Sequence, residues 1–348
     1  MRKERYKCVY VIDPYMIFHL LAVFTLEAVM GDAATTLWSG HGSNGSERSR
    51  GNVTLPELTV AVQARVVITL VLFVFSALAN MAVFRSILRR RRVKGRSHVQ
   101  LLMGNLSGAH LLYTALVMPT DAIWNITLQW HAGDVACRLL MFLKMFAMQS
   151  CAIMTVVISL DRQAVVANPL AFGRTRSKIR MLWTAWCLSA LLAVPHMFLF
   201  HTMSPVEYPN FVQCVTHGSY SNDWEEILHN MFMFLCLFLL PFFIMVSCYC
   251  RILLVMSKNM REVTGLSLRR SKNIIPRARL HTIKMSIIIV VSFIICWGPY
   301  YTLGIWYWFD HAMLDRQDIS LDAQHILFTL SMFNSCIDPV VYGIFSAH

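Results

Sequence analysis

The chain has 348 residues, of which 56% are hydrophobic and 14% are charged, and its mean hydropathy is +0.52. One soluble core does not need so much apolar side chain, so the composition excludes an ordinary soluble domain and indicates contact with lipid. The formal net charge is +12. Because the basic residues gather in a few loops between apolar segments, this charge indicates membrane topology, and we expect no nucleic-acid partner.

The amino-terminal region resembles a signal peptide. An apolar stretch, Tyr10–Met30, follows a basic start and leads into the small residues of Gly31–Ala34. Asp13 and Glu27 interrupt the stretch, which argues against an eighth membrane span. We therefore predict a signal peptide over about 1–34, either cleaved or kept as a tail.

The segment up to residue 60 is predicted to lie outside the cell. Asn44 and Asn52 each begin an Asn-x-Ser/Thr acceptor for glycosylation, in a Gly/Ser-rich stretch without periodicity. A third acceptor at Asn125 lies at the end of an apolar segment, and its status stays open.

Seven long apolar segments follow. Each exceeds the roughly 20 residues that a helix needs to cross a membrane. Backbone groups in lipid must be hydrogen-bonded within the segment, so these runs predict helices. The fold class is an all-α membrane protein, a seven-transmembrane helix bundle over 61–345, with 346–348 starting a cytoplasmic C-terminus. The predicted segments are Val62–Leu88, Val99–Ile123, Val135–Val166, Ile179–Phe200, Ile227–Met256, Leu280–Trp308 and Leu321–Phe345.

Loop charges predict the orientation. Short loops rich in Lys and Arg face the cytoplasm, and here they follow the first, third and fifth segments, at 89–96, 174–180 and 258–279. The alternate connections are acidic or neutral. We therefore predict a multi-pass plasma-membrane protein with its N-terminus outside and its C-terminus inside.

Two of the ten cysteines stand apart from the spans. Cys137 lies at the outer start of the third segment, and Cys214 lies in the long second outer loop. Both face an oxidising compartment, so a disulfide that holds this loop over the bundle is expected.

Several ionisable residues lie inside the spans, where charge is costly and usually functional. Lys144 and Arg162 are 162 − 144 = 18 positions apart, which is about five helical turns or roughly 27 Å. They therefore share one face of the third helix at opposite ends. The ionisable set is His110, Asp121, Lys144, Asp161, Arg162 and Asp338.

The chain resembles the rhodopsin-like G-protein-coupled receptors over Ala61 to Phe345. The anchors that carry the resemblance stand in order on the right segments. They are Asn80, Asp161-Arg162-Gln163, Trp186, Pro241, Cys296-Trp297-Gly298-Pro299 and Asp338-Pro339-Val340-Val341-Tyr342.

Longer strings resemble the gonadotropin-releasing hormone receptors. The Asp-Arg-Gln ending of the third segment is similar to the non-mammalian or type II branch of that family. The strings are VMPTDAIWNITLQWHAGDVAC (Val117 to Cys137), VVISLDRQ (Val156 to Gln163), QCVTH (Gln213 to His217), SKNIIPRARL (Ser271 to Leu280) and PYYTLGIWYWFD (Pro299 to Asp310).

The resemblance implies a peptide hormone outside and a heterotrimeric G protein of the Gq/11 class inside, with phospholipase C and calcium downstream. It also implies that Asp121, Asn125, Lys144 and Tyr307 contact the hormone, with Asn125 near its amidated end. Polar and aromatic side chains should converge on one outer cavity. The predicted cavity residues are Asp121, Trp124, Asn125, Lys144, Asn230, Tyr301, Trp306, Tyr307 and His325. The alternatives are tryptophans in an interfacial belt and a salt bridge between Asp121 and Lys144.

At the inner end, Asp161 is expected to hold Arg162 at rest and release it when the sixth helix swings outward. Pro299 would be the hinge of that helix, because proline removes a backbone hydrogen bond and crowds the preceding turn. Trp297 would sense ligand at the floor of the cavity, with ordinary core packing as the alternative. The predicted activation residues are His110, Asp161, Arg162, Trp297, Pro299, Asp338 and Tyr342.

His110 departs from the superfamily, which usually has Asp there. We predict that His110 pairs with Asp338, so that the usual sodium site is weakened and activity depends on pH. A neutral histidine that is merely hydrogen-bonded is the alternative.

Other functions find little support. The chain has no HExxH or GxSG motif, so no enzyme activity, cofactor or metal is expected, and membrane lipid is the remaining partner. The last segment has no lysine for a light-sensing Schiff base. The alternative function is a rhodopsin-like receptor for another amidated peptide, such as a vasopressin-like hormone, or a decoy that does not signal.

Overall fold

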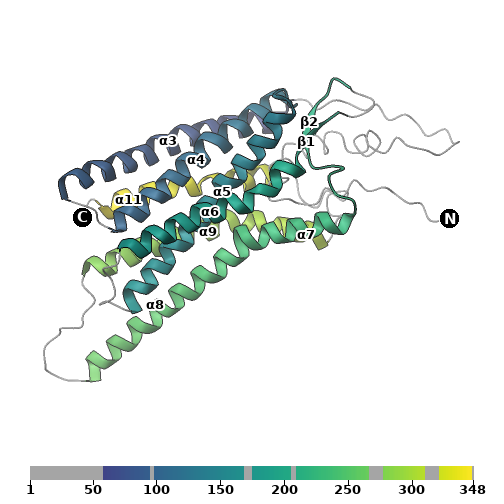
Figure 1. The fold of residues 1–348 in the computed structure, drawn as a ribbon. Coiled ribbons are helices and arrows are strands. Elements are labelled where there is room, and N and C mark those ends of the chain that lie inside the picture. The colour runs from purple at the N-terminus through teal and green to yellow at the C-terminus, as the bar shows by residue number, and fades with distance from the viewer. Residues whose placement is uncertain are drawn as a thin grey trace.

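The structure is a computed structural model of the whole chain, shown in Figure 1. It describes residues 58–94, 98–167, 175–204, 209–265, 277–309 and 321–346. The elements are α3 (Val60–Lys94), α4 (His98–Thr127), α5 (Gly133–Ala167), α6 (Thr175–Leu199), β1 (His201–Met203), β2 (Gln213–Val215), α7 (Asp223–Phe234), η1 (Leu235–Leu239), α8 (Leu240–Gly265), α9 (Arg277–Phe309), α10 (Leu321–Met332) and α11 (Asn334–Ser346).

Seven stretches of helix in the described residues are long and apolar enough to cross a membrane, which confirms the predicted fold class. The fifth joins α7, η1 and α8, and the seventh spans parts of α10 and α11. The stretches are Val60–Arg89, Val99–Thr127, Gly133–Ala167, Ser177–Leu199, Trp224–Val255, Ile283–Leu303 and Ile326–Ile344.

The helices form one bundle around α5. Helix α5 packs against α4, α6, α8 and α9, and α11 packs against α9 and α3. Strands β1 and β2 form an antiparallel pair at one end of the bundle, which we call the hairpin end, and the C-terminus lies at the other, the C-terminal end (Figure 1). Helix α8 runs well past its neighbours at the C-terminal end (Figure 1).

The first helix shows why the bundle suits lipid. Its exposed face is apolar, with Val67, Val71 and Leu78 more than half exposed, while Ser76 and Asn80 are buried against other helices. A water-soluble helix has the reverse arrangement. In lipid, apolar side chains can face outward and polar groups must find partners inside.

Two interruptions in the helices were not predicted. The π-helix η1 ends just before Pro241, whose ring cannot donate a hydrogen bond and crowds the turn before it, so a widened turn accommodates it. Phe333 separates α10 from α11 in a turn, where its N–H donates to the carbonyl of Leu330 over 3.1 Å.

Candidate functional site

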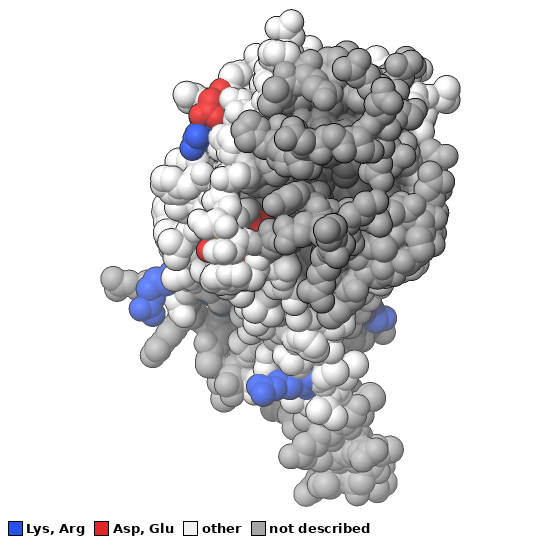
Figure 2. Space-filling model, turned by 90° about the vertical axis from the view of Figure 1, so that its right-hand side faces the viewer, with Lys and Arg blue, Asp and Glu red and all other residues white. Residues whose placement is uncertain are grey.

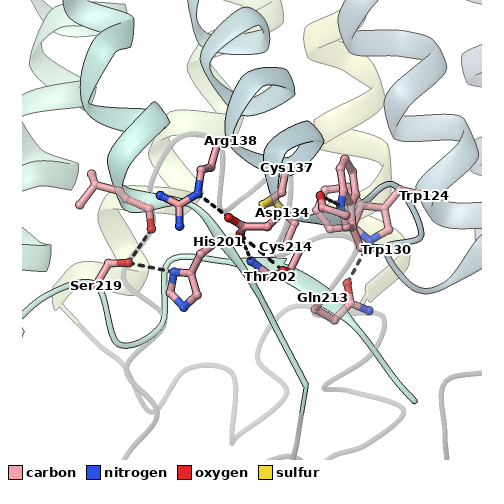
Figure 3. The surroundings of a disulfide bond; sticks show 12 residues. Trp124, Trp130, Asp134, Cys137, Arg138, His201, Thr202, Gln213, Cys214 and Ser219 are labelled. Atoms are coloured by element: carbon pink, nitrogen blue, oxygen red, sulfur yellow. Dashed lines mark hydrogen bonds and ion pairs between the residues drawn. A yellow bond between two sulfur atoms is a disulfide. The ribbon is translucent and has the colours of Figure 1, made fainter. Parts of the chain in front are cut away.

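The hairpin is tied covalently to the third membrane helix. Cys137 of α5 and Cys214 of β2 form the predicted disulfide, with their Cα atoms 5.7 Å apart (Figure 3). Thr202 of β1 lies opposite Cys214 in the strand pair. The loop that carries β1 and β2 is therefore held against the start of α5.

A second tie runs through Asp134, in the first turn of α5. Its carboxylate accepts a hydrogen bond from the backbone N–H of Thr202 at 2.8 Å and one from Arg138 Nε at 2.7 Å (Figure 3). The backbone N–H of Trp130 donates to the carbonyl of Val212 over 2.8 Å. The hairpin is thus fixed to α5 and to the loop before it.

The hairpin also positions Trp124. Its indole N–H donates to Gln213 Oε1 at 3.0 Å (Figure 3). The amide nitrogen of Gln213 donates to the carbonyl of Leu128 at 2.8 Å. The rings of Trp124 and Trp130 are 4.9 Å apart. Trp124 is buried, so it does not belong to an interfacial belt.

Beneath this layer lies a buried charge cluster, which we call the outer cluster: Arg65, Asp121 and Lys144. Arg65 Nη2 donates to Asp121 Oδ1 at 2.6 Å, and the guanidinium lies 4.3 Å from the ring centre of Phe328. Lys144 Nζ lies 5.7 Å from the ring centre of Trp124. All three charged residues are at most 3% exposed.

Sequence reasoning missed Arg65. Asp121 forms an ion pair with Arg65, and Lys144 is also close enough to act on Asp121 electrostatically, as the alternative of a salt bridge between Asp121 and Lys144 requires. A signal was present, because Arg65 is an ionisable residue inside the first apolar segment.

Apart from Tyr301, the other predicted cavity residues fall into three groups. Asn125 and Asn230 are buried, and the amide nitrogen of Asn125 donates to the carbonyl of Asp121 at 2.7 Å. Trp306 is 45% exposed, so it lies on the surface of α9. The side chains of Tyr307 and His325 lie outside the described residues.

Tyr301 belongs to an aromatic cluster between α7, η1 and α9. Its ring is 4.6 Å from that of Phe238 and 5.9 Å from that of Trp297. The indole of Trp297 also meets Tyr300 edge-on at 6.1 Å. Trp297 is thus packed among rings, and its sensing role stays a prediction.

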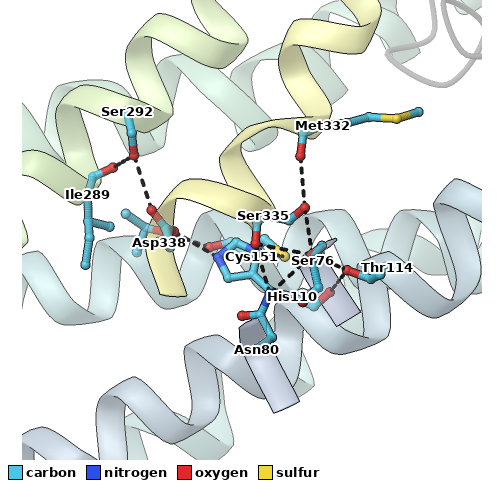
Figure 4. A network of polar contacts seen from close by, with 11 residues as sticks. Ser76, Asn80, His110, Thr114, Cys151, Ile289, Ser292, Met332, Ser335 and Asp338 are labelled. Carbon is cyan, nitrogen blue, oxygen red and sulfur yellow. Dashed lines mark hydrogen bonds and ion pairs between the residues drawn. The ribbon is translucent and has the colours of Figure 1, made fainter. Parts of the chain in front are cut away.

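At the middle of the bundle, the predicted contact between His110 and Asp338 is present, with Nε2 and Oδ2 2.8 Å apart (Figure 4). The other ring nitrogen of His110 lies 3.6 Å from Cys151 Sγ, and Ser292 Oγ donates to Asp338 Oδ1 at 3.2 Å. Asn80 donates to the carbonyl of Ser335 at 2.9 Å. The network joins α3, α4, α5, α9 and α11.

At the C-terminal end of α5, Arg162 Nη2 donates to Asp161 Oδ2 at 2.6 Å, as expected. Lys178 of α6 lies 2.7 Å from Asp161 Oδ1, a contact the sequence did not predict. Tyr342 is buried in α11, and Pro299 lies inside the continuous helix α9. Their roles in activation stay predictions.

Charge is sparse on the described surface of the hairpin end. Figure 2 looks onto the hairpin end, where the described surface is mostly uncharged and the Lys and Arg side chains in view lie towards its margins. In the hairpin, partial burial, together with nearby His201, lowers the pKa of His217.

Asn44, Asn52 and the expected signal peptide lie outside the described residues. Within the described ranges, no group of three or more His, Cys, Asp and Glu side chains could hold a metal ion.

Comparison with known proteins agrees with this geometry. Residues 79–342 match the family described as 7 transmembrane receptor (rhodopsin family). The chain is 46% identical over 297 residues to the gonadotropin-releasing hormone II receptor of Clarias gariepinus, covering 84% of this chain and 78% of that protein. It is 47% identical over 319 residues to the type II receptor of Chlorocebus aethiops, covering 89% and 81%. It is 42% identical over 303 residues to the gonadotropin-releasing hormone receptor of Homo sapiens, covering 84% and 92%.

A seven-helix bundle, a loop pinned by a disulfide and buried charges at both ends of α5 therefore accompany a family match over most of the chain. The chain belongs to the rhodopsin family of seven-transmembrane receptors, among the gonadotropin-releasing hormone receptors.

Proposed function

We propose that the chain is a plasma-membrane receptor that binds a gonadotropin-releasing hormone peptide at the hairpin end and activates a heterotrimeric G protein of the Gq/11 class at the C-terminal end. The observation that carries the proposal is the outer cluster beneath a loop pinned by a disulfide. The names of the similar proteins supply the hormone class.

The outer cluster supports peptide binding through its excess of positive charge. Two cations, Arg65 and Lys144, accompany one carboxylate, Asp121, in a buried setting. The ion pair engages Arg65, whereas Lys144 lies over an aromatic face, a contact worth about 0.5–2 kcal/mol. A peptide carbonyl or hydroxyl can accept a stronger, charge-assisted hydrogen bond from the ammonium, at about 1.5–3 kcal/mol.

Neighbouring groups suit an amidated peptide. Asn125 and Asn230 are buried amides that can pair with peptide groups, and Trp124 offers an aromatic wall that the hairpin holds in place. Mixed aromatic and polar linings are typical of such sites. The resemblance adds Tyr307, and Trp306 and His325 belong to the proposed rim.

The signalling end is proposed from Arg162. In the structure its guanidinium is buried and paired with Asp161, which suits a resting state. When α9 bends outward at Pro299, Arg162 would leave the carboxylate and meet the G protein. Trp297, the His110–Asp338 pair and Tyr342 would transmit the change between the two ends.

The orientation is proposed from charge and redox chemistry. The three loops rich in Lys and Arg would face the cytoplasm, whereas the disulfide suits the oxidising outer side. We place 1–60 outside with glycans on Asn44 and Asn52, the bundle at 61–345, and the start of the cytoplasmic C-terminus at 346–348.

Calcium measurements in cells that express the chain test the proposal. We expect gonadotropin-releasing hormone peptides to release calcium, and an inhibitor of phospholipase C to abolish the response. Mock-transfected cells and an Arg162→Gln variant serve as controls and should stay silent. A larger response to a vasopressin-like peptide would favour the alternative hormone, and binding without any calcium signal would contradict the Gq/11 assignment.

A further inference from the structure

The carboxylate of Asp161 holds two cations at once. Its Oδ2 accepts from Arg162 Nη2 at 2.6 Å, and its Oδ1 lies 2.7 Å from Lys178 Nζ. The side chain of Asp161 is 2% exposed, that of Arg162 is 3% exposed and that of Lys178 is 15% exposed. Each oxygen of this buried carboxylate therefore has its own cationic partner.

The two cations come from different helices. Arg162 adjoins Asp161 on α5, whereas Lys178 lies near the start of α6, which packs along α5. Arg162 also lies near Tyr249 of α8, close enough for an electrostatic interaction. The side chain of Arg162 therefore has a neighbour on α8, in addition to Asp161 on its own helix.

Separating Arg162 from Asp161 would normally be strongly unfavourable. A buried carboxylate that loses its partner becomes an uncompensated charge in a poorly solvating environment. A second cation that stays in contact removes most of this penalty. Lys178 has the position needed, because it contacts Oδ1 while Arg162 donates to Oδ2.

We propose that Lys178 is a positioning residue that keeps Asp161 neutralised when Arg162 leaves it, and so makes the release of Arg162 easier. The inference rests on the proposed switching role of Arg162. In the resting state both Arg162 and Lys178 contact the carboxylate, and in the active state the contact with Lys178 remains. Lys178 thus contributes more to the active state than to the resting state, because there it compensates the carboxylate without help from Arg162.

A purely structural role for Lys178 predicts a different result. If Lys178 only tied α6 to α5, its loss would lower stability without changing the balance between resting and active receptor. If it reinforced the resting lock, its loss would raise signalling without hormone. Our proposal predicts that its loss makes activation harder.

The test measures hormone-stimulated nucleotide exchange on a G protein in membranes that hold the full chain. We expect Lys178→Met to need about tenfold more hormone for half-maximal exchange, which corresponds to about 1.4 kcal/mol. Lys178→Arg should restore most of the potency. Arg180→Met is the matched control, because Arg180 is an exposed cation two residues further along the same helix, and it should not change potency.

A double-mutant cycle separates the proposed role from general damage. Asp161→Asn removes the charge that needs compensation, so adding Lys178→Met to that variant should shift potency less than twofold. Surface binding of labelled hormone corrects each variant for the amount of folded receptor.

Three results would overturn the inference: unchanged potency of Lys178→Met, raised exchange without hormone, or an equal loss in the Asp161→Asn background. Normal signalling by Arg162→Gln would instead refute the switching role of Arg162, and the inference would fall with it. Lost signalling by Arg162→Gln, with no effect of Lys178→Met, would refute the inference alone.

Discussion

The two ends of α5 each bury one carboxylate with two cations, but the contacts differ. In the outer cluster, Asp121 is paired with Arg65 at 2.6 Å, and Lys144 lies over the ring of Trp124. One cation therefore holds the helices together, while the other has an aromatic contact that a ligand can replace.

At the C-terminal end of the bundle, the two cations share one carboxylate, that of Asp161. Asp161 contacts both Arg162 and Lys178, each within 2.7 Å. One cation can leave without exposing a buried negative charge. Each of the two clusters thus has two cations and one carboxylate, and on the proposed roles the surplus positive charge serves hormone binding in one cluster and the release of Arg162 in the other.

The largest expected effect concerns the ion pair of the outer cluster. Asp121→Asn leaves Arg65 buried without a carboxylate partner, and we expect a loss of about 3–5 kcal/mol in folding stability. The melting temperature of purified receptor in detergent measures this loss. Adding Arg65→Gln should recover part of it, because one of the two buried cations of the cluster is then gone, while Lys144 remains.

The matched control for that variant is Asp134→Asn. Asp134 and Arg138 form a partly exposed pair, with side chains 42% and 39% exposed, so its loss should cost less than about 1 kcal/mol. Equal losses for the two variants would show that the outer cluster is not energetically special.

The next effect concerns hormone binding by the outer cluster. Lys144→Gln should weaken hormone binding about 100-fold, or about 2.7 kcal/mol, because a charge-assisted hydrogen bond is lost. Competition binding against a labelled hormone peptide measures it, and Lys144→Arg should keep part of the affinity. If affinity stays unchanged while Lys178→Met lowers potency, the outer cluster is structural and the division of roles between the two ends is wrong.

Much of the fold was predictable from single segments. Length and apolar composition predicted seven spans, and the positions of Cys137 and Cys214 predicted the disulfide. The contact between Asp161 and Arg162 was also predictable, because the two residues are neighbours in the chain. Such features depend on local sequence or on a choice among few candidates.

Contacts between helices were harder to predict. Arg65 and Lys178 were visible as charges, yet their partners are 56 and 17 residues away, and the pairing depends on how the helices rotate and pack. The π-helix before Pro241 and the turn at Phe333 also depend on packing. His110 is the exception, because an ionisable residue deep in a span has few possible partners.

The smallest expected effect tests the contact between His110 and Asp338, which lies in the middle of the bundle. His110 contacts Asp338 at 2.8 Å, in a place where a cation would otherwise be needed to balance the carboxylate. His110→Asp would place two carboxylates side by side, and such a pair attracts a cation or a proton. We therefore expect the variant to gain sodium sensitivity, with hormone potency falling about fivefold when sodium replaces N-methylglucamine at constant ionic strength. The unaltered receptor and His110→Asn should change less than twofold. If His110→Asp responds to sodium no more than the unaltered receptor does, His110 does not stand in for a cation, and the centre of the bundle couples the two ends by packing alone.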